Sequence, residues 1–300
     1  MMNNFHDPVL LHESITGLDI KPNGVYVDVT FGGGGHSKQI LNMLLNGKLI
    51  AFDQDLEAIR NTIKADSRFT MIHDNFRHIK KALVKHNIIS IDGLIADLGV
   101  SSYQFSDNNR GFSLKYDAPL DMRMNDKVTK DGVFILNNYN QSELNRIFKN
   151  HADFHSPNII SSAILQARRV NKINTVQDLK DVFSNVSTTQ NIKFLARIFQ
   201  AIRIEVNEEL DALKEMLSQA LELLSPSGRL VVISYHSLED RLVKNFMKFG
   251  NFSGLHEKDF FGNLLTPFEI ITKKPVTPSI REISQNNKSR SAKLRICAKK

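Results

Sequence analysis

Cysteine is almost absent from this chain of 300 residues, in which Cys297 is the single example. One cysteine cannot form an internal disulfide, and it leaves no CxxC pair that could bind zinc or an iron–sulfur cluster. We therefore expect a protein whose chemistry involves no metal.

Long apolar runs are also missing. No stretch approaches the roughly 20 apolar residues that span a bilayer, and the opening MMNNFHDPVLLHE has no basic segment followed by an apolar one, as a secretory signal would. Hydrophobic residues make up 41% of the chain and charged residues 24%, which is ordinary for a folded globular protein. The sequence predicts a cytoplasmic protein with no membrane partner, and it leaves the oligomeric state open.

Acidic residues are scarce in one region, the C-terminal segment 273–300. It holds nine lysines and arginines against one acid, Glu282, whereas the rest of the chain has 30 basic and 31 acidic residues. The net charge of +7 is therefore concentrated in this segment. We expect a flexible basic tail whose cations reach the phosphates of a nucleic acid, although a solvated basic terminus would have the same composition.

What the sequence does contain begins with short apolar runs that alternate with amphipathic stretches. Helical patterns start at Ser37, at Asp55 and around His78, between runs that have the character of buried strands. This alternation predicts an α/β fold with a parallel sheet. The expected strands are VYVDVT (25–30), KLIAFD (48–53), FTMIH (69–73) and IDGLIAD (91–97).

The alternation then stops, and 106–204 has the pattern of several helices. Asn140 with Glu143, and Thr175 with Asp178, have the spacing of helix N-caps and their partners. The alternation returns with a helix near 207–224, the turn SPSG (225–228), the strand RLVVIS (229–234), a helix from Ser237, and short β-like runs near Gly254 and Phe268. We expect the first part of an α/β domain at 1–105, an inserted helical domain for substrate recognition at 106–206, the second part at 207–272, and the basic tail at 273–300.

The segment VDVTFGGGGHS (27–37) places four glycines directly after the first predicted strand. Ligands of open parallel sheets bind beyond the carboxyl ends of the strands, so this loop is a candidate site. The glycines do not give the GxGxxG spacing of a dinucleotide site cleanly, and Asp28 would not favour a pyrophosphate nearby. An acid here suits a cationic ligand, and S-adenosylmethionine, which has an ammonium, a sulfonium and no phosphate, fits.

On this hypothesis Gly34, Gly35 and His36 offer backbone groups to the methionyl end of the cofactor. Asp53, at the end of the second strand, accepts hydrogen bonds from both ribose hydroxyls, and Phe76, after the third strand, covers the adenine. Two alternatives stay open: His36 could be a helix-start residue with no ligand, and Phe76 a core residue that caps the sheet.

The segment ADLGVSSYQ (96–104) places Asp97 at the end of the fourth strand, where methyl donor and acceptor meet in this architecture. A carboxylate that accepts the protons of an exocyclic amine would favour the geometry in which the nitrogen attacks the methyl group. Asp97 is therefore the candidate catalytic residue, although it could instead contact the cofactor or cap a loop. Gln104 could bind the polar edge of the cofactor or be an exposed loop residue.

These motifs, in this order, resemble the RsmH (MraW) family of ribosomal RNA methyltransferases over nearly the whole chain. The motifs that carry the resemblance are HDPVLLHE (6–13), DVTFGGGGHS (28–37), AFDQD (51–55), ADLGVSSYQ (96–104), RGFS (110–113), PLDMRM (119–124), FQAIRIEVNEEL (199–210), ISYHSLEDRLVK (233–244) and SRSAKLR (289–295).

The resemblance implies a class I methyltransferase with a Rossmann-like, mostly parallel sheet. It implies that S-adenosylmethionine is the cofactor, and that the substrate is the exocyclic N4 of a cytidine in 16S rRNA, at the decoding centre of the small ribosomal subunit. The family's cofactor contacts fall on the residues already selected, which are Gly34, Gly35, His36, Asp53, Phe76, Asp97 and Gln104.

The sequence departs from the family pattern at three places. Tyr103 stands where the family usually has proline, so it could stack on the target base or only fill space. Asn287 and Lys288 replace a Pro-Arg pair, and HADFHSPN (151–158) lacks a Gly-Glu-Glu pattern. The last two changes bear on how the tail and the insertion contact RNA.

A flipped-out cytidine needs a pocket with polar groups, and the segment HSLEDR after the fifth strand is the candidate. We expect His236, Ser237 and Arg241 to contact the substrate, although Ser237 with Asp240 could be only a helix cap. Arg123 is expected to hold a phosphate beside Arg241, or else to form a structural salt bridge with Asp121. A further cluster, Arg168, Arg169 and Lys172, could grip rRNA by charge or be a solvated helix end.

Three other functions compete with rRNA methylation. A nicotinamide-dependent oxidoreductase is disfavoured by Asp28 and by the glycine spacing. A non-catalytic RNA-binding factor on the same fold is disfavoured by the presence of all three acids, Asp28 within the first strand and Asp53 and Asp97 at strand ends. The nearest alternative is a methyltransferase that acts on another nucleic-acid or protein amine.

Overall fold

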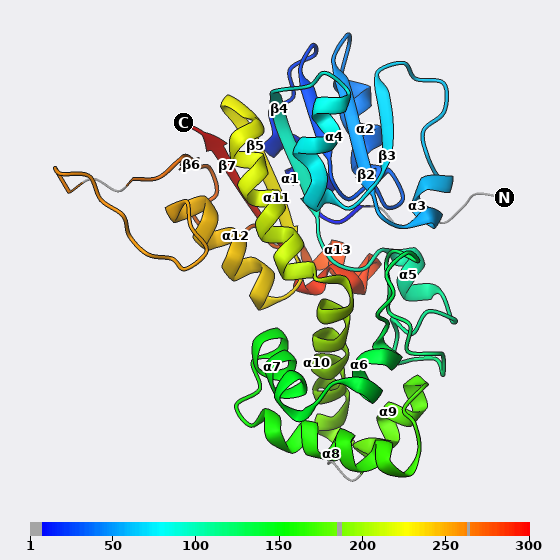
Figure 1. Ribbon diagram of the computed structural model, residues 1–300. Helices are drawn as coiled ribbons and strands as arrows, with labels where there is room; N and C mark the ends of the chain where they lie inside the picture. Colours follow the sequence, from blue (N-terminus) through cyan, green and yellow to red (C-terminus); the bar gives the residue numbers. More distant parts are fainter. Residues whose placement is uncertain (1–7, 185–187, 263–264) are drawn as a thin grey trace. The chain divides into compact units, whose positions relative to one another are not determined.

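The computed structural model describes residues 8–184, 188–262 and 265–300, which form two compact units (Figure 1). The first unit contains residues up to Gly99 and from Leu210 onward, and the second runs from Val100 to Glu209. These divisions lie a few residues from those expected at 105 and 206. None of the helices in the described ranges is long and apolar enough to cross a membrane.

The first unit is built on a seven-stranded sheet with the order β3-β2-β1-β4-β5-β7-β6. The first five strands in this order are parallel, and β7 runs antiparallel to both β5 and β6. The predicted mostly parallel, Rossmann-like sheet is therefore confirmed. The strands are β1 (Val25–Asp28), β2 (Lys48–Asp53), β3 (Phe69–His73), β4 (Ile91–Asp97), β5 (Leu224–Ser234), β6 (Phe268–Ile270) and β7 (Lys293–Lys299).

Helices cover both faces of this sheet, which is why its central strands β1 and β4 are mostly buried and apolar between their charged residues. The helices and 3-10 helices of this unit are α1 (Leu11–Leu18), α2 (Gly35–Met43), α3 (Leu56–Arg60), η1 (Phe76–His78), α4 (Ile79–Lys85), α11 (Glu209–Leu223), α12 (Ser237–Phe249), α13 (Ile280–Gln285) and η2 (Asn287–Ser291).

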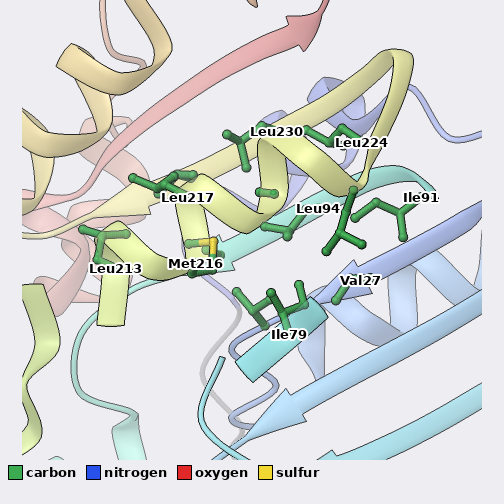
Figure 2. Packing of buried hydrophobic residues seen from close by; sticks show 14 of the residues in the cluster. Val27, Ile79, Ile91, Leu94, Leu213, Met216, Leu217, Leu224 and Leu230 are labelled. Atoms are coloured by element: carbon green, nitrogen blue, oxygen red, sulfur yellow. The ribbon is translucent and has the colours of Figure 1, made fainter. Parts of the chain in front are cut away.

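One face of the sheet packs against α4, α11 and α12. Figure 2 shows this packing, in which Leu213, Met216 and Leu217 of α11 belong to the same cluster as Leu94 of β4 and Leu230 of β5. The three α11 residues recur at helical spacing, so they form one apolar stripe. The opposite face packs against α1 and α2, through side chains that alternate with the first set along each strand.

The strand β5 starts earlier than expected. The predicted turn at 225–228 lies within it as an irregularity, because Ile91 pairs with Leu224 and the next pair is Gly93 with Arg229. The short run near Phe268 is a strand, whereas the segment around Gly254 is an irregular loop.

The prediction of a flexible basic tail at 273–300 is wrong. Residues 293–299 form β7, which lies inside the sheet between β5 and β6. The charges of Lys293 and Arg295 alternate with the buried side chains of Leu294 and Ile296, so the segment has the pattern of a strand with one polar face. Net charge obscured that alternation in the sequence.

The second unit is helical, as expected for the insertion, and has its own apolar core. Capping boxes start three of its helices, and two of them, Asn140 with Glu143 and Thr175 with Asp178, were predicted from their spacing. Its helices are α5 (Ser102–Ser106), α6 (Gly132–Asn138), α7 (Gln141–Ala152), α8 (Pro157–Val170), α9 (Val176–Val182) and α10 (Thr188–Asn207).

Candidate active site

Four neighbouring parallel strands end at the same edge of the sheet, and their last residues define the candidate site. The acids Asp28, Asp53 and Asp97 end β1, β2 and β4, and Tyr235 directly follows β5. This is the edge at which open α/β sheets bind ligands.

Asp28 organises the glycine loop from within the protein. Its side chain is 1% exposed, and its two carboxylate oxygens accept hydrogen bonds from the Ser37 hydroxyl at 2.6 Å and from the Thr30 amide at 3.1 Å. Burial raises the pKa of this carboxyl, while the two hydrogen bonds lower it. Asp28 thus ties the end of β1 to the first turn of α2.

The glycine loop is a tight turn that leads into α2. The Gly34 amide donates to the Phe31 carbonyl at 2.7 Å, and Gly34 has a φ of 76°, which favours glycine. At Gly35, a Cβ would lie 2.0 Å from Cγ of Pro8, so a side chain would clash there. No side chain caps α2, and its N-terminus carries partial positive charge that suits a ligand carboxylate.

The His36 side chain turns inward. It is buried, and its Nε2–H donates to the Val9 carbonyl at 3.2 Å. Burial lowers the pKa of this imidazole to about 4, so the ring is neutral. Only the backbone of His36 is thus a candidate for ligand contact. Val9 belongs to the opening motif HDPVLLHE, whose first two residues lie outside the described ranges.

Asp53 connects the end of β2 to the same loop. One of its carboxylate oxygens accepts from the Gly32 amide at 2.8 Å, and the other accepts from the Asp55 amide at 2.9 Å. The pKa of Asp53 is raised to about 6. Burial is the largest cause and the charges of Asp55 and Asp28 also raise it, whereas the two hydrogen bonds lower it. Because a carboxylate oxygen can accept two hydrogen bonds, each oxygen retains one acceptor position for a hydroxyl.

Phe76 begins the 3-10 helix η1 after β3, near the end of β2. The Asp74 amide donates to the Asp53 carbonyl at 3.1 Å, which holds the two strand ends together. The Phe76 ring is partly exposed and also packs against the core of the first unit. Its position is compatible with both expected roles, as a core residue and as a cover for the adenine.

Asp97 is held by two groups from different strands. Its carboxylate accepts the Tyr235 hydroxyl hydrogen at 2.8 Å, and its amide donates to the Thr30 hydroxyl at 2.6 Å. The pKa of Asp97 is raised to about 7. Burial is the largest cause, and the charges of Asp28 and Glu239 also raise it, whereas the Tyr235 bond lowers it. A carboxyl group that titrates near neutral pH is suited to exchange protons.

Sequence reasoning missed Tyr235 because its partner is 138 residues away. The signal was present, since Tyr235 directly follows the predicted strand 229–234, and neighbouring parallel strands place their ends together. Pairing of β4 with β5 puts Asp97 opposite Ile233, two residues before Tyr235.

The HSLEDR segment has a different cap from the one considered. His236, not Ser237, is the N-cap of α12, and its partner is the buried Glu239. The carboxylate of Glu239 accepts from the Tyr235 amide at 2.9 Å. Ser237 is exposed at the first position of α12.

The two charged residues that end this motif differ in their environment. Asp240 accepts hydrogen bonds from Arg295 at 2.6 Å and Lys293 at 3.2 Å, so these two cations of β7 are used within the fold. The neighbouring Arg241 is exposed on α12.

Three residues expected at the site belong to the second unit. Gln104 closes the capping box of α5, because its side-chain oxygen accepts from the Ser101 amide at 3.0 Å. Tyr103 lies next to it on α5 and is 39% exposed. The Arg123 guanidinium donates twice to Asp121, both at 2.8 Å, and to the Val128 carbonyl at 2.8 Å, which is the structural salt bridge considered as its alternative.

The basic cluster at the end of α8 and just after it is only partly available to a ligand. Arg168 donates to the carbonyls of Leu136 and Tyr139 at 2.9 and 2.8 Å, so it caps the C-terminal end of α6. Arg169 and Lys172 are exposed.

In the divergent segment 151–158, His151 belongs to what we call the Glu205 cluster. Glu205 of α10 accepts hydrogen bonds from Tyr139 at 2.9 Å, from His151 at 2.9 Å and from Arg146. These bonds lower the pKa of Glu205 to about 2, although burial opposes them.

Comparison with known proteins gives a consistent result. The sequence profile of the MraW methylase family matches residues 3–300. Proteins named Ribosomal RNA small subunit methyltransferase H are similar to the chain over almost its full length. That of Flavobacterium johnsoniae is 52% identical and covers 98% of both chains. That of Flavobacterium psychrophilum is 53% identical over 97% of this chain and 100% of its own, and that of Parabacteroides distasonis is 49% identical over 98% and 97%.

Proposed function

The chain belongs to the MraW methylase family, and on that premise we propose that it methylates the exocyclic N4 of a cytidine in 16S rRNA, at the decoding centre of the small ribosomal subunit. The names of its relatives support the small-subunit rRNA as substrate. One structural observation carries the chemistry: the Asp97 carboxylate lies at the same sheet edge as a glycine loop lined by two further acids.

The strand-end residues fit S-adenosylmethionine as the cofactor. Asp53 keeps one acceptor position on each oxygen for the two ribose hydroxyls, because its other acceptor positions are filled by backbone amides. The uncapped start of α2 at Gly34 and Gly35 suits the methionyl carboxylate. Phe76 is assigned to the adenine, and the backbone of His36 to the methionyl end. The bound cofactor supplies a methyl group activated by a sulfonium.

Asp97 is the proposed catalytic residue. In its ionised form it accepts a hydrogen bond from the target amine, which favours attack by the nitrogen lone pair, and it then takes the proton that the nitrogen loses. Its pKa of about 7 allows both steps near neutral pH. The remaining rate acceleration comes from orientation and from the fixed charges of the site.

For the substrate, we assign His236, Ser237 and Arg241, at the start of α12, to the nucleotide and its flanking phosphates. Arg241 is exposed, as a phosphate ligand must be. Arg123 is assigned to a second phosphate. Because Arg123 is also held by Asp121, its replacement is expected to cost stability as well as RNA affinity. Gln104 is assigned to the cofactor, and the site of action is the cytoplasm.

The decisive experiment is mass spectrometry of nucleosides from 16S rRNA of cells that lack the protein, followed by methylation of their small subunits with labelled cofactor. We expect N4-methylated cytidine to disappear in the deletion and to return when the purified protein is added. An unchanged nucleoside profile, with a purified protein that still binds S-adenosylmethionine, would move the substrate to another nucleic-acid or protein amine.

A further inference from the structure

Tyr235 is fixed at several points between β5 and α12. Its amide donates to the buried carboxylate of Glu239 at 2.9 Å, which anchors the backbone at the start of α12. Its ring lies beside Gly99, where an added Cβ would be 3.5 Å from the ring carbon Cδ2. The hydroxyl then reaches the Asp97 carboxylate at 2.8 Å. A side chain held in this way delivers its hydroxyl to one place.

Two acidic groups of the described residues act on the charge of Asp97. Asp28, from β1, and Glu239, from α12, both disfavour the charged form of Asp97, as does burial. The Thr30 hydroxyl accepts from the Asp97 amide, and the Thr30 side chain also forms a hydrogen bond that lowers the pKa of Asp28. The Tyr235 hydroxyl supplies a hydrogen bond that favours the charged form.

We infer that Tyr235 is a positioning residue for methyl transfer, which orients the Asp97 carboxylate and stabilises its charged form so that one oxygen can accept from the target amine. This inference rests on the proposed function. It goes beyond it by assigning a role to a residue that the proposed function places neither at the cofactor nor at the reacting amine.

A tyrosine suits this role better than a cation. An arginine or lysine paired with Asp97 would hold the carboxylate in its charged form so strongly that it could not take up a proton after transfer. A neutral hydroxyl orients the acid and still allows it to titrate. The carboxylate keeps acceptor positions for the amine, because the hydroxyl occupies only one of them.

The first test is a titration that does not depend on activity. The pKa of Asp97 would be measured by NMR in protein labelled with ¹³C at the aspartate carboxyls, with Asp97→Asn used to assign the signal. In Tyr235→Phe we expect this pKa to rise by about one to two units, because a hydrogen bond to a charged group is lost. Tyr139→Phe is the matched control, since it removes a tyrosine–carboxylate bond elsewhere and should leave Asp97 unchanged.

The second test is the pH profile of methylation with small subunits as substrate. Tyr235→Phe should lower kcat about tenfold at pH 7 and recover most of it by about pH 9, with unchanged KM for the subunit and unchanged cofactor affinity. A loss of kcat that is equal at every pH would mean a structural role and would overturn the inference, as would an unshifted Asp97 titration. A wild-type enzyme that methylates no rRNA would instead refute the proposed function, while the NMR titration still reports on the pair.

Discussion

Asp97 and Glu205 each accept a hydrogen bond from a tyrosine hydroxyl, one in the α/β unit and the other in the helical unit, and their acidities differ widely. The pKa of Asp97 is raised to about 7, whereas that of Glu205 is lowered to about 2. The other neighbours explain the difference. Asp97 faces Asp28 and Glu239, while Glu205 also binds Arg146 and His151.

The comparison separates an acid poised for proton transfer from an acid that holds a fold together. Glu205 joins α10 to α7 and to Tyr139, just beyond α6, and every donor that it binds stabilises its charged form. Asp97 has a donor that orients it and neighbours that oppose its charge. A tyrosine–carboxylate contact is therefore no guide to function until the remaining charges are counted.

The largest expected effect concerns catalysis. Asp97→Asn should lower kcat by about 10²–10⁴-fold, because an amide can accept a hydrogen bond from the amine but cannot take up its proton. Single-turnover methylation would measure this. Glu205→Gln is the matched change in the other cluster and should keep kcat near the wild-type value. Equal losses in the two variants would remove the distinction between the clusters.

A third acid, Asp53, extends the comparison to a carboxylate held by backbone amides. Asp53→Ala should weaken S-adenosylmethionine binding by about 100-fold or more in calorimetry, because two charge-assisted hydrogen bonds to the ribose are lost. The exposed Glu57→Gln on α3 serves as the control. Near-normal affinity in Asp53→Ala would remove Asp53 from the ribose site.

An effect on the free energy of unfolding is expected in the Glu205 cluster. Glu205→Gln is expected to lower the free energy of unfolding by about 2 kcal/mol in urea titrations, because Arg146 and His151 lose their charged partner. Asp181→Asn, an exposed acid on α9, should cost less than about 0.5 kcal/mol. A similar small cost for Glu205→Gln would show that the cluster contributes little.

The pH dependence of stability should have opposite signs at the two acids. The folded pKa of Glu205, about 2, is below its ordinary 4.5, so its contribution is present above pH 4.5 and is lost as the pH falls toward 2. The folded pKa of Asp97, about 7, is above its ordinary 3.8, so the folded state loses stability as the pH rises from 3.8 through 7.

Two variants measured across this range would show both signs. Asp97→Asn should match the wild type at low pH and exceed its free energy of unfolding by up to about 4 kcal/mol at pH 8. The free energy of unfolding of Glu205→Gln should fall furthest below that of the wild type above pH 4.5. If the two variants gave parallel curves of unfolding free energy against pH, the opposite pKa shifts of Asp97 and Glu205 would be contradicted.

The smallest expected effect concerns Arg241, which is exposed on α12. Arg241→Ala should weaken binding to small subunits by about tenfold or less and reduce the salt dependence by about one charge, with unchanged cofactor affinity. Arg60→Ala, an exposed arginine on α3, is the control. Equal loss of RNA and cofactor affinity in Arg241→Ala would argue against a phosphate contact.

Local patterns in the sequence were sufficient for most of the fold. The bounds of β2, β3 and β4 were predicted, because parallel strands are short apolar runs between turn signals. Asp53 and Asp97 were predicted to lie at strand ends for the same reason, whereas Asp28 was expected inside the first strand and instead ends β1. Thr175 with Asp178, and Asn140 with Glu143, were recognised from spacing alone.

What the sequence did not reveal depends on pairing between distant segments. Tyr235 meets Asp97 only because β4 and β5 are neighbours, and Arg295 meets Asp240 only because β7 pairs with β5. The cap of α12 was misplaced by one residue, since serine is the commoner N-cap and His236 is an unusual one. The basic composition of 273–300 led to the prediction of a flexible tail. The alternation of Leu294 and Ile296 with charged residues would have favoured a strand.

The interior position of β7 sets the order in which the protein can fold during its synthesis. Residues 100–209 contain every segment of the helical unit, so that unit can form while later residues are still being made. The sheet lacks an interior strand until residue 299 is added, roughly 90 residues later, a delay of about 5–20 s at ordinary translation rates. Until then β5 presents an unpaired edge, so the nascent chain depends on protection from aggregation although the strand-end residues of its active site have already been made.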